Sequence, residues 1–467
     1  MRAETKRYAP PIRRRDPSIT QPPLSFAQQR LWFMEQLEPG NAAYNIPMGV
    51  KWLGPLNLTV FEKSVSEIVS RHETMRTTFA NVGGEPVQVI SPPAKVSLPV
   101  VDLIALPKTE HASEIDRARR TEVQTAFDLA KGPLWRAKLL RFAPEEHIVL
   151  FTLHHSISDG WSLNVLVREM VELYTAFSYG RPSPLEPLPV QYADFAIWQR
   201  EWLQGDTLNC ELDYWAKQLR GAPTRLELPT DRPSTPKGHR DGALHSFTIP
   251  PDVALKLKEI ARREEATLFM VLFAGFAALL SRYSGQEDVL IGTAIAGRQR
   301  AELEKLIGFF INTLVIRTDL KGNPSFRDLV GRVREAMLGA YAHQDVPFEK
   351  LVEELQPERS LSNNPLFQVL MVMQNLPRGR MILEGLDLEW FEVQEVSAKF
   401  DLSLVVAESE KGVQGTFLYS TDVFDASTIA RMAERYESLL RDAAQGRYLA
   451  SNDKSRELAS AFNAPLE

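Results

Sequence analysis

The sequence contains almost no cysteine and no long apolar run. Cys210 is the only cysteine among 467 residues, which excludes internal disulfides and a multi-cysteine metal site and favours a reducing compartment. The longest apolar segment, residues 266–280, is shorter than a membrane-spanning helix and indicates a buried helix. The first residues are rich in arginine and proline, unlike a secretory signal. We therefore expect a cytoplasmic protein with no membrane span.

A strong charge of one sign and the common nucleophile motifs are also lacking. The formal net charge is −6 and no long stretch is strongly basic, which argues against a nucleic-acid partner. The chain has no Gly-x-Ser-x-Gly elbow, no cysteine near a histidine and no phosphate loop of the Gly-x-x-x-x-Gly-Lys-Ser/Thr type. The composition of the whole sequence, 44% hydrophobic and 24% charged, is that of a soluble globular protein.

The length and the distribution of proline predict two main domains. We expect a tail or linker over residues 1–22, an N-terminal lobe over 23–220, a C-terminal lobe over 221–450 and a further linker over 451–467. The boundary between the lobes is placed at the proline-rich stretch from Gly221 to Gly238, where few regular elements can form. Strands and helices alternate in both halves, so the predicted fold class is α/β.

Hydrophobic periodicity places individual elements. Ser25 is a suitable N-cap for an amphipathic helix that follows it. Further helices are expected near residues 56–72, 162–179, 252 onward, 267 onward and 326–343. Strands are expected near residues 135–139, 148–153, 244–247, 288–291, 367–373 and 402–407.

Two adjacent histidines follow the most apolar of these strands. Residues 148–153 are apolar at nearly every position, as in a strand buried on both faces, and His154, His155 and Asp159 come directly after it. Histidine exchanges protons near neutral pH. Adjacent side chains on an extended backbone point to opposite sides, so we expect one ring to face a cavity and the other to pack inside.

The orientation of the two histidines and the residues around them argue against two kinds of site. A metal site is disfavoured because neighbouring histidines that face apart are poor co-ligands. A hydrolase is disfavoured because no protein nucleophile accompanies the histidines. The remaining hypothesis is a histidine that acts as a general base or polar anchor while one substrate attacks another directly.

The segment His154-His155-x-x-x-Asp159-Gly160-Trp161-Ser162 resembles the active-site motif of condensation domains of non-ribosomal peptide synthetases. Related acyltransferases and epimerisation domains carry similar versions of that motif, so the surrounding segments matter. Six of them resemble further signatures of the family in order: LSFAQQRLWF at 24–33, RHETMRTTF at 71–79, YADFAIW at 192–198, IGFFINT at 307–313, HQDVPFE at 343–349 and NNPL at 363–366. The resemblance covers residues 24 to about 405, which is nearly the whole chain.

The resemblance implies a fold and a set of partners. It implies two lobes similar to chloramphenicol acetyltransferase that form a V-shaped pseudo-dimer, with a tunnel between them and His155 at its midpoint. Segments near residues 292–300 and 375–400 are expected to cross from the second lobe to the first. The implied partners are an acceptor peptidyl carrier protein domain, a donor carrier protein or acyl-coenzyme A, and an adjacent adenylation domain. No cofactor is expected to be bound permanently, because the substrates travel on phosphopantetheine, and the excised domain is expected to be monomeric.

The resemblance also assigns roles to residues. It implies that His155 is the catalytic residue and that His154, Asp159, Gly160 and Arg76 support the active-site loop, with Arg76 paired to Asp159. A broken buried pair of this kind costs roughly 3–5 kcal/mol. Gly160 is expected to serve the turn. The remaining candidates would line the tunnel: Trp161, Ser162 and Asn312. We expect no metal ligand.

The implied reaction is attack of an acceptor α-amine on a donor acyl thioester, which forms an amide. The alternatives are a stand-alone coenzyme A-dependent acyltransferase, a non-catalytic recruitment domain and an epimerisation domain. Recruitment domains typically lose residues of the histidine motif, whereas this chain keeps all of them. A heterocyclisation domain would carry aspartates in place of both histidines.

The donor is left open between a fatty or short acyl group and an aminoacyl group. If Met1 is the natural start, no carrier protein precedes the domain, and a starter type that loads an acyl group is slightly favoured. Otherwise the chain resembles the type that joins two L-amino acids. Residues 460–465 resemble the entry to a following adenylation domain.

Overall fold

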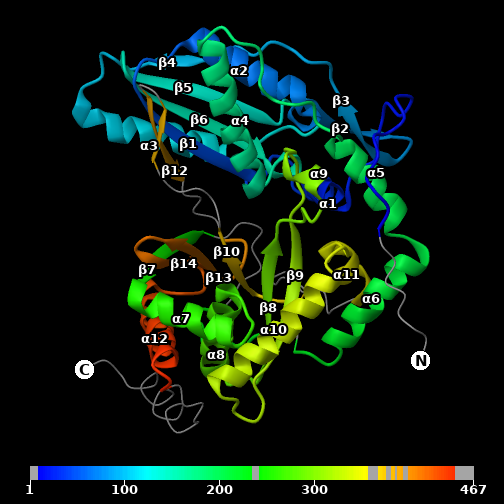
Figure 1. Cartoon of the computed structure of the whole chain (residues 1–467), viewed down its shortest axis with the longest axis vertical. Helices are drawn as coiled ribbons and strands as arrows, with labels where there is room; N and C mark the ends of the chain where they lie inside the picture. Colours follow the sequence, from blue (N-terminus) through cyan, green and yellow to red (C-terminus); the bar gives the residue numbers. More distant parts are fainter. Residues whose placement is uncertain are drawn as a thin grey trace. The chain divides into compact units, whose positions relative to one another are not determined.

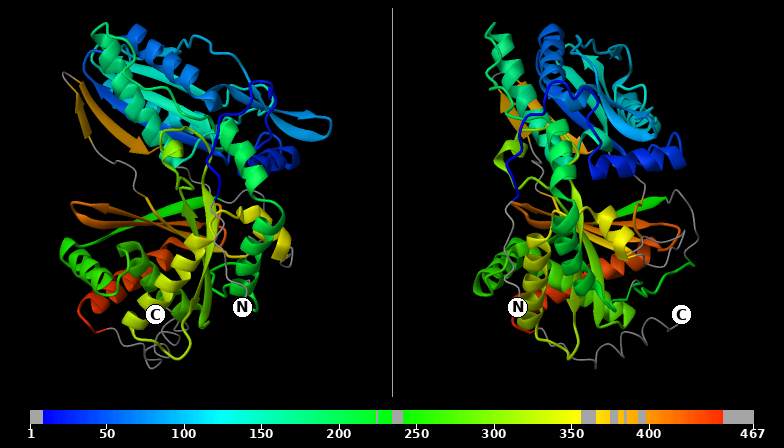
Figure 2. Two further views of the ribbon diagram at one scale, coloured as in Figure 1. Left: turned by 45° about the vertical axis from the view of Figure 1, so that its right-hand side comes forward. Right: turned by 90° about the vertical axis from the view of Figure 1, so that its right-hand side faces the viewer.

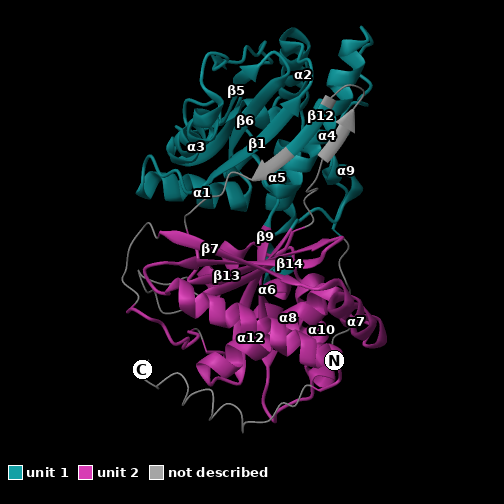
Figure 3. Ribbon diagram, turned by 90° about the vertical axis from the view of Figure 1, so that its left-hand side faces the viewer, with its two compact units in different colours: residues 1–209, 296–311, 376–395 teal, residues 210–295, 312–375, 396–467 magenta. Residues whose placement is uncertain are grey.

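The computed structural model describes residues 9–223, 225–233, 241–355, 366–374, 380–383, 386–392 and 398–447. The chain divides into two compact units (Figure 3). Unit 1 comprises residues 1–209, 296–311 and 376–395, and unit 2 comprises residues 210–295, 312–375 and 396–467. The predicted linker over 451–467 and residues 363–365 of the last signature lie outside the described residues.

Unit 1 is built on a mixed six-stranded sheet of order β11-β12-β1-β6-β5-β4. Its central strand β6 pairs antiparallel with both β1 and β5, with Asn45 of β1 opposite His154. The strands of this sheet are β1 (Asn45–Leu53), β4 (Val100–Asp102), β5 (Trp135–Ala143), β6 (Glu146–His154), β11 (Arg380–Leu383) and β12 (Leu386–Glu392). A separate hairpin is formed by β2 (Thr77–Val82) and β3 (Glu85–Ile90).

Helices cover both faces of this sheet. Helices α2 (Leu58–Arg71) and α4 (Gly160–Ser178) share a core with one face, where Phe61, Phe151 and Leu166 are among the buried residues (Figure 1, Figure 2). Helix α3 (Lys108–Gln124) packs Ala118 against a smaller cluster that includes Leu150. The sheet is therefore buried on both faces, which explains why β6 is apolar at nearly every position from 148 to 153. The other helical segments of unit 1 are α1 (Phe26–Leu37), η1 (Glu73–Arg76), η2 (His155–Ile157), α5 (Tyr192–Trp202) and α9 (Ala301–Glu304).

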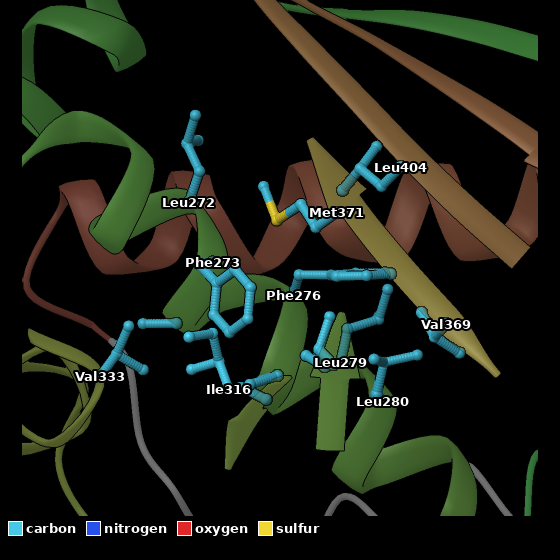
Figure 4. Packing of buried hydrophobic residues seen from close by; sticks show 14 of the residues in the cluster. Leu272, Phe273, Phe276, Leu279, Leu280, Ile316, Val333, Val369, Met371 and Leu404 are labelled. Carbon is cyan, nitrogen blue, oxygen red and sulfur yellow. The ribbon is translucent and has the colours of Figure 1, made fainter. Parts of the chain in front are cut away.

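Unit 2 has a second mixed six-stranded sheet, of order β7-β14-β13-β10-β8-β9. Its strands are β7 (Gly242–Ile249), β8 (Asp288–Ile295), β9 (Asn312–Asp319), β10 (Val369–Met373), β13 (Leu402–Ser409) and β14 (Gly412–Ser420). Its helices are α6 (Gly205–Leu219), α7 (Pro251–Arg263), α8 (Leu268–Ser284), α10 (Phe326–Ala342), α11 (Phe348–Leu355) and α12 (Ala426–Ala444). The apolar helix α8 contributes Phe273 and Phe276 to the core of this unit, in one buried cluster with Met371 and Leu404 (Figure 4).

The first change of unit occurs earlier than the proline-rich stretch suggested. It lies between Asn209 and Cys210, within α6, rather than between residues 220 and 221. The physical reason is Trp215, which is 2% exposed in the core of unit 2 and donates its indole N–H to the carbonyl of His343. A helix anchored in this way belongs to the second core even though proline appears only after it.

The described part of the N-terminal tail, residues 9–22, has no helix but is packed against unit 1. Ile12 is buried in a cluster with Tyr192, Phe195 and Phe310. Arg15 forms ion pairs with Glu73 at 2.9 Å and with Asp194 at 3.1 Å. This segment therefore forms part of the folded unit rather than a loose tail (Figure 1).

No single helix in the described ranges is long and apolar enough to cross a membrane, although α7 and α8, bent by 103° at the break between them, pass that test as a pair.

Candidate active site

The histidine motif sits where β6 ends and α4 begins. His154 is the last residue of β6, His155 opens the short helix η2, and Asp159 is the N-cap of α4. The carboxylate of Asp159 accepts the backbone N–H of Ser162 at 2.8 Å. Aspartate is favoured at this position because it satisfies a free N–H and complements the helix dipole. The sequence thus turns sharply after the buried strand and holds the histidines at its end.

His155 has a defined tautomer and a defined neighbour. Its backbone N–H donates to the carbonyl of Tyr44 at 2.8 Å, and its Nδ1 lies 3.1 Å from the carbonyl oxygen of Ser158. A carbonyl can only accept, so Nδ1 carries the hydrogen and the neutral ring keeps its lone pair on Nε2. The ring is half-buried and packs at 5.2 Å, centroid to centroid, against Phe309.

His154 is directed into the interior, as expected for one of two adjacent histidines. It is 2% exposed, and its Nδ1 accepts the backbone N–H of Ser156 at 3.2 Å and lies 2.8 Å from the Ser156 hydroxyl oxygen. Its ring also contacts Phe127 and Tyr44 edge-on. These contacts fix the start of the loop that presents His155.

Asp159 is completely buried and is neutralised by Arg298. The Arg298 guanidinium lies 3.1 Å from one carboxylate oxygen of Asp159, and the Arg298 side chain is 1% exposed. The other carboxylate oxygen accepts the backbone N–H of Phe310 at 3.0 Å. Burial lowers the pKa of Arg298, and the charge of Asp159 acts in the opposite direction. Arg298 also donates to the carbonyls of Leu303 and Leu306, so one cation joins the histidine loop to the 303–310 segment.

The expected pairing of Arg76 with Asp159 is wrong. Arg76 instead lies 3.9 Å from Glu73 and donates to the carbonyl of Ser91. The two arginines differ in burial: the Arg76 side chain is 16% exposed, whereas Arg298 is nearly inaccessible. Arg298 is 139 positions from Asp159 in sequence, so no local pattern connects them. A buried carboxylate needs a cationic partner, and this requirement was the one signal that could have indicated a second arginine near Asp159.

The remaining candidates have different surroundings. Ser162 is fully buried, with its hydroxyl 2.7 Å from the Asp159 carboxylate and 2.8 Å from the carbonyl of Gly308. Trp161 is 43% exposed and donates its indole N–H to the carbonyl of Glu304. Gly160 is the first residue of α4.

Asn312 belongs to unit 2 rather than to the unit that holds His155. Its side-chain amide donates to the carbonyls of Gln344 and Val346 and accepts the backbone N–H of Phe348. It therefore holds the loop that carries the HQDVPFE signature. Whether Trp161, Ser162 and Asn312 line a tunnel stays a prediction.

A buried histidine–glutamate pair beside the site was not anticipated from the sequence. His72 Nε2 lies 2.7 Å from the carboxylate of Glu169, which also accepts Arg71 at 3.0 Å. Burial lowers the pKa of His72, and its Nδ1 accepts the backbone N–H of Ile307 at 3.3 Å, so the ring is neutral. Burial raises the pKa of Glu169, but the hydrogen bonds from His72 and Arg71 outweigh it and the net pKa is lowered.

The first signature also reaches the histidine loop. Gln28, on α1, donates its side-chain amide to the carbonyl of Ser156 at 3.0 Å, and Ser25 forms a capping box with Gln28. Hence residues from the segments at 24–33 and 307–313 contact the histidine loop, and His72 from the segment at 71–79 contacts Ile307. This convergence gives a structural reason for signatures that lie far apart in sequence.

A small pocket, partly open to solvent, lies in unit 1 between α4 and the sheet. Its lining is entirely apolar, includes Met48, Trp52 and Met170, and does not include His155. Among the described residues, no group of three or more His, Cys, Asp or Glu side chains is placed to hold a metal ion.

Comparison with known proteins gives consistent matches. A family model described as a condensation domain matches residues 19–457. One of the linear gramicidin synthase proteins of Brevibacillus parabrevis is 50% identical over 420 residues, which is 90% of this chain and 5% of that protein. A phosphinothricin tripeptide synthetase of Streptomyces viridochromogenes is 42% identical over 93% of this chain and 40% of that protein. The chain spans only 5%, 8% and 9% of three linear gramicidin synthase proteins that it matches.

Solved structures show the same mixed α/β fold. The X-domain in its complex with OxyB from teicoplanin biosynthesis matches with a TM-score of 0.84 and 26% identity, covering 96% of this chain and 98% of that one. The first condensation domain of the calcium-dependent antibiotic synthetase, in complex with a substrate analogue, matches with a TM-score of 0.77. It is 22% identical and covers 92% of this chain and 98% of its own, so this likeness shows the fold.

Proposed function

This chain belongs to the condensation-domain family, and from that premise we propose that it joins two thioester-bound substrates through an amide bond. The observation that carries the proposal is the geometry of His155. Its Nδ1–H is held by the carbonyl of Ser158, so Nε2 is the atom able to accept a proton. The buried Asp159–Arg298 pair stabilises the loop that carries this ring.

In the proposed reaction the acceptor α-amine attacks the carbonyl carbon of the donor thioester. The C–N bond forms, the C–S bond breaks, and the proton lost by the amine passes through Nε2 of His155 to the departing sulfur. A thioester is already activated, so holding the amine and the carbonyl together supplies much of the rate, up to ~7–11 kcal/mol for well-oriented reactants. Proton transfer by His155 adds on the order of 10²- to 10⁴-fold.

We assign both substrates to phosphopantetheine arms of carrier protein domains. The support is the 50% identity to a linear gramicidin synthase protein. A carrier-bound aminoacyl or peptidyl donor is therefore favoured over acyl-coenzyme A. An adenylation domain that supplies the acceptor would be the neighbouring partner.

A recruitment role is the second candidate, because the X-domain that shares this fold was solved in complex with another protein, OxyB. It predicts a domain with no condensation activity of its own. The complete histidine motif of this chain favours catalysis.

The test uses the domain with two separately loaded carrier proteins and follows the acceptor carrier by intact-protein mass spectrometry. The donor mass is expected to appear on the acceptor carrier. His155→Ala is expected to lower the rate at least ~10²-fold while leaving the thermal unfolding midpoint unchanged. The matched control is His147→Gln, which changes a buried histidine at the opposite end of β6.

Three outcomes are informative. Transfer by wild type and His147→Gln but not by His155→Ala supports the proposal. Equal transfer by His155→Ala excludes the assigned role of this ring. No transfer by folded wild type, with either a carrier-bound or an acyl-coenzyme A donor, favours recruitment.

A further inference from the structure

Phe309 is an aromatic residue that contacts the His155 imidazole. The ring centroids lie 5.2 Å apart and the planes meet at 55°. Phe309 is half-buried, whereas Gly308 and Phe310 on either side of it are buried. The position of this ring is therefore set mainly by the backbone on which it sits.

Four consecutive backbone units, residues 307–310, are each held by a side chain from elsewhere in unit 1. Ile307 and Gly308 are each bound through both the N–H and the carbonyl. Phe309 is bound through its carbonyl, and Phe310 through its N–H. The partners are His72 and Thr74 for Ile307, Ser162 for Gly308, Tyr192 for Phe309, and Asp159 for Phe310. A strip bound at every residue has little freedom, so Phe309 presents its ring at a fixed angle.

Among the side chains that bond residues 307–310, Tyr192 is the one that binds Phe309, whose ring contacts His155. Its hydroxyl donates to the carbonyl of Phe309 at 2.6 Å and lies 2.8 Å from the hydroxyl oxygen of Ser25. The carbonyl can only accept, so the Tyr192 proton points to Phe309 and Ser25 donates to Tyr192. Tyr192 is 1% exposed, and burial raises the pKa of its hydroxyl, so it stays a neutral donor.

The Tyr192 ring also lies directly against the strip. A Cβ atom added at Gly308 would lie 2.2 Å from Cδ2 of Tyr192, a contact that neither group could accommodate. The ring packs edge-on against Phe310 as well, at 4.8 Å. Tyr192 therefore contacts this strip through both its ring and its hydroxyl.

We infer that Tyr192 is a positioning residue for the condensation reaction, acting on the His155 imidazole through the backbone and ring of Phe309. The inference rests on the proposed function, because its readout is amide formation. Loss of the Tyr192 hydroxyl leaves the Phe309 carbonyl without this donor and lets the strip shift. The His155 ring then loses its fixed neighbour.

The first measurement compares Tyr192→Phe with Tyr174→Phe in steady-state condensation assays with both carriers loaded. Tyr174 is a matched control, because it is also buried in unit 1 and its hydroxyl also bonds a backbone group, the N–H of Asn57 at 2.9 Å. Tyr192→Phe is expected to lower kcat about tenfold, the effect of one well-placed hydrogen bond, with KM changed less than about twofold. Tyr174→Phe is expected to leave kcat unchanged.

The second measurement is a double-mutant cycle with Phe309→Ala. If Tyr192 acts through Phe309, then Tyr192→Phe has no further effect on kcat once the Phe309 ring is absent. Equal loss in both backgrounds, or an unchanged kcat in Tyr192→Phe, overturns the inference. If Tyr192→Phe does not fold, Phe309→Ala alone decides, and an unchanged kcat in that variant also overturns the inference.

Failure of the proposed function is distinguishable from these outcomes. A folded wild-type domain that forms no amide refutes the proposed function. An active wild type with an inactive His155→Ala and a fully active Tyr192→Phe refutes only the role of Tyr192.

Discussion

The surroundings of His155 in unit 1 and the core around α8 in unit 2 are stabilised by different forces. The loop after β6 is held by buried polar contacts in which Asp159, Arg298 and Ser162 bond each other and the backbone. Residues 268–280 of helix α8 are apolar or glycine at every position, and Phe273 and Phe276 are fully buried (Figure 4). Polar contacts fix direction, whereas apolar burial is non-directional and supplies stability. Substitutions in the two regions should therefore separate activity from stability.

The largest combined effect is expected for Asp159→Ala. It leaves the Arg298 guanidinium buried without its counter-ion, which costs roughly 3–5 kcal/mol of unfolding free energy. The histidine loop also loses the cap of α4, so amide formation should fall together with stability. Urea unfolding and the carrier assay measure the two quantities. A soluble, normally stable and inactive variant would instead indicate a direct chemical role for Asp159.

A large effect on stability without an effect on activity is expected for Phe276→Ala. It removes a fully buried ring that packs near Phe417 and Tyr436, at a cost of about 3–5 kcal/mol of unfolding free energy. Because the change lies in the core of unit 2, the rate of amide formation per folded molecule should be unchanged at a temperature where the variant is fully folded. A large loss of kcat in fully folded protein would show that the two regions are coupled.

A smaller effect is expected from pH through His72. Its pKa is lowered by burial, so the unfolded chain binds a proton more readily than the folded one. The unfolding free energy should therefore decrease as pH falls below about 6.5, by up to about 1.4 kcal/mol per pH unit from this group. Glu169 adds a further loss at lower pH, because its net pKa is also below its ordinary value.

The variant His72→Gln removes this contribution. It should flatten the slope of unfolding free energy just below pH 6.5, relative to wild type, and it also changes the pKa of Glu169, which loses the hydrogen bond from His72. Denaturant unfolding at several pH values measures it. Parallel curves for the two proteins would show that His72 is not buried in neutral form.

The sequence predicted the elements whose signals are local. Ser25 caps α1 as expected, the apolar run before His154 is a central strand, and the buried helix α8 begins directly after Thr267. N-caps and hydrophobic periodicity depend on residues within a few positions of each other, which is why they can be recognised without a structure.

The contacts that build the site could not be predicted in the same way. Asp159 and Arg298 are 139 positions apart, and His72 is 97 positions from Glu169. Such pairs depend on which elements the fold brings together. The family resemblance implied Arg76 as the partner of Asp159, and nothing in the sequence distinguishes a partly exposed arginine from a buried one. The V-shaped arrangement and the tunnel between lobes stay predictions.

The role of Arg298 is tested by comparing Arg298→Ala with Arg76→Ala in one carrier-based condensation assay, alongside their unfolding free energies. Arg298→Ala is expected to lose amide formation and roughly 3–5 kcal/mol of stability, because Asp159 is left buried without its counter-ion. Arg76→Ala is expected to keep its activity and to lose no more than about 1 kcal/mol, as for a partly exposed ion pair. An active Arg298→Ala beside an inactive Arg76→Ala would contradict the assignment of Arg298 as the residue that braces the histidine loop.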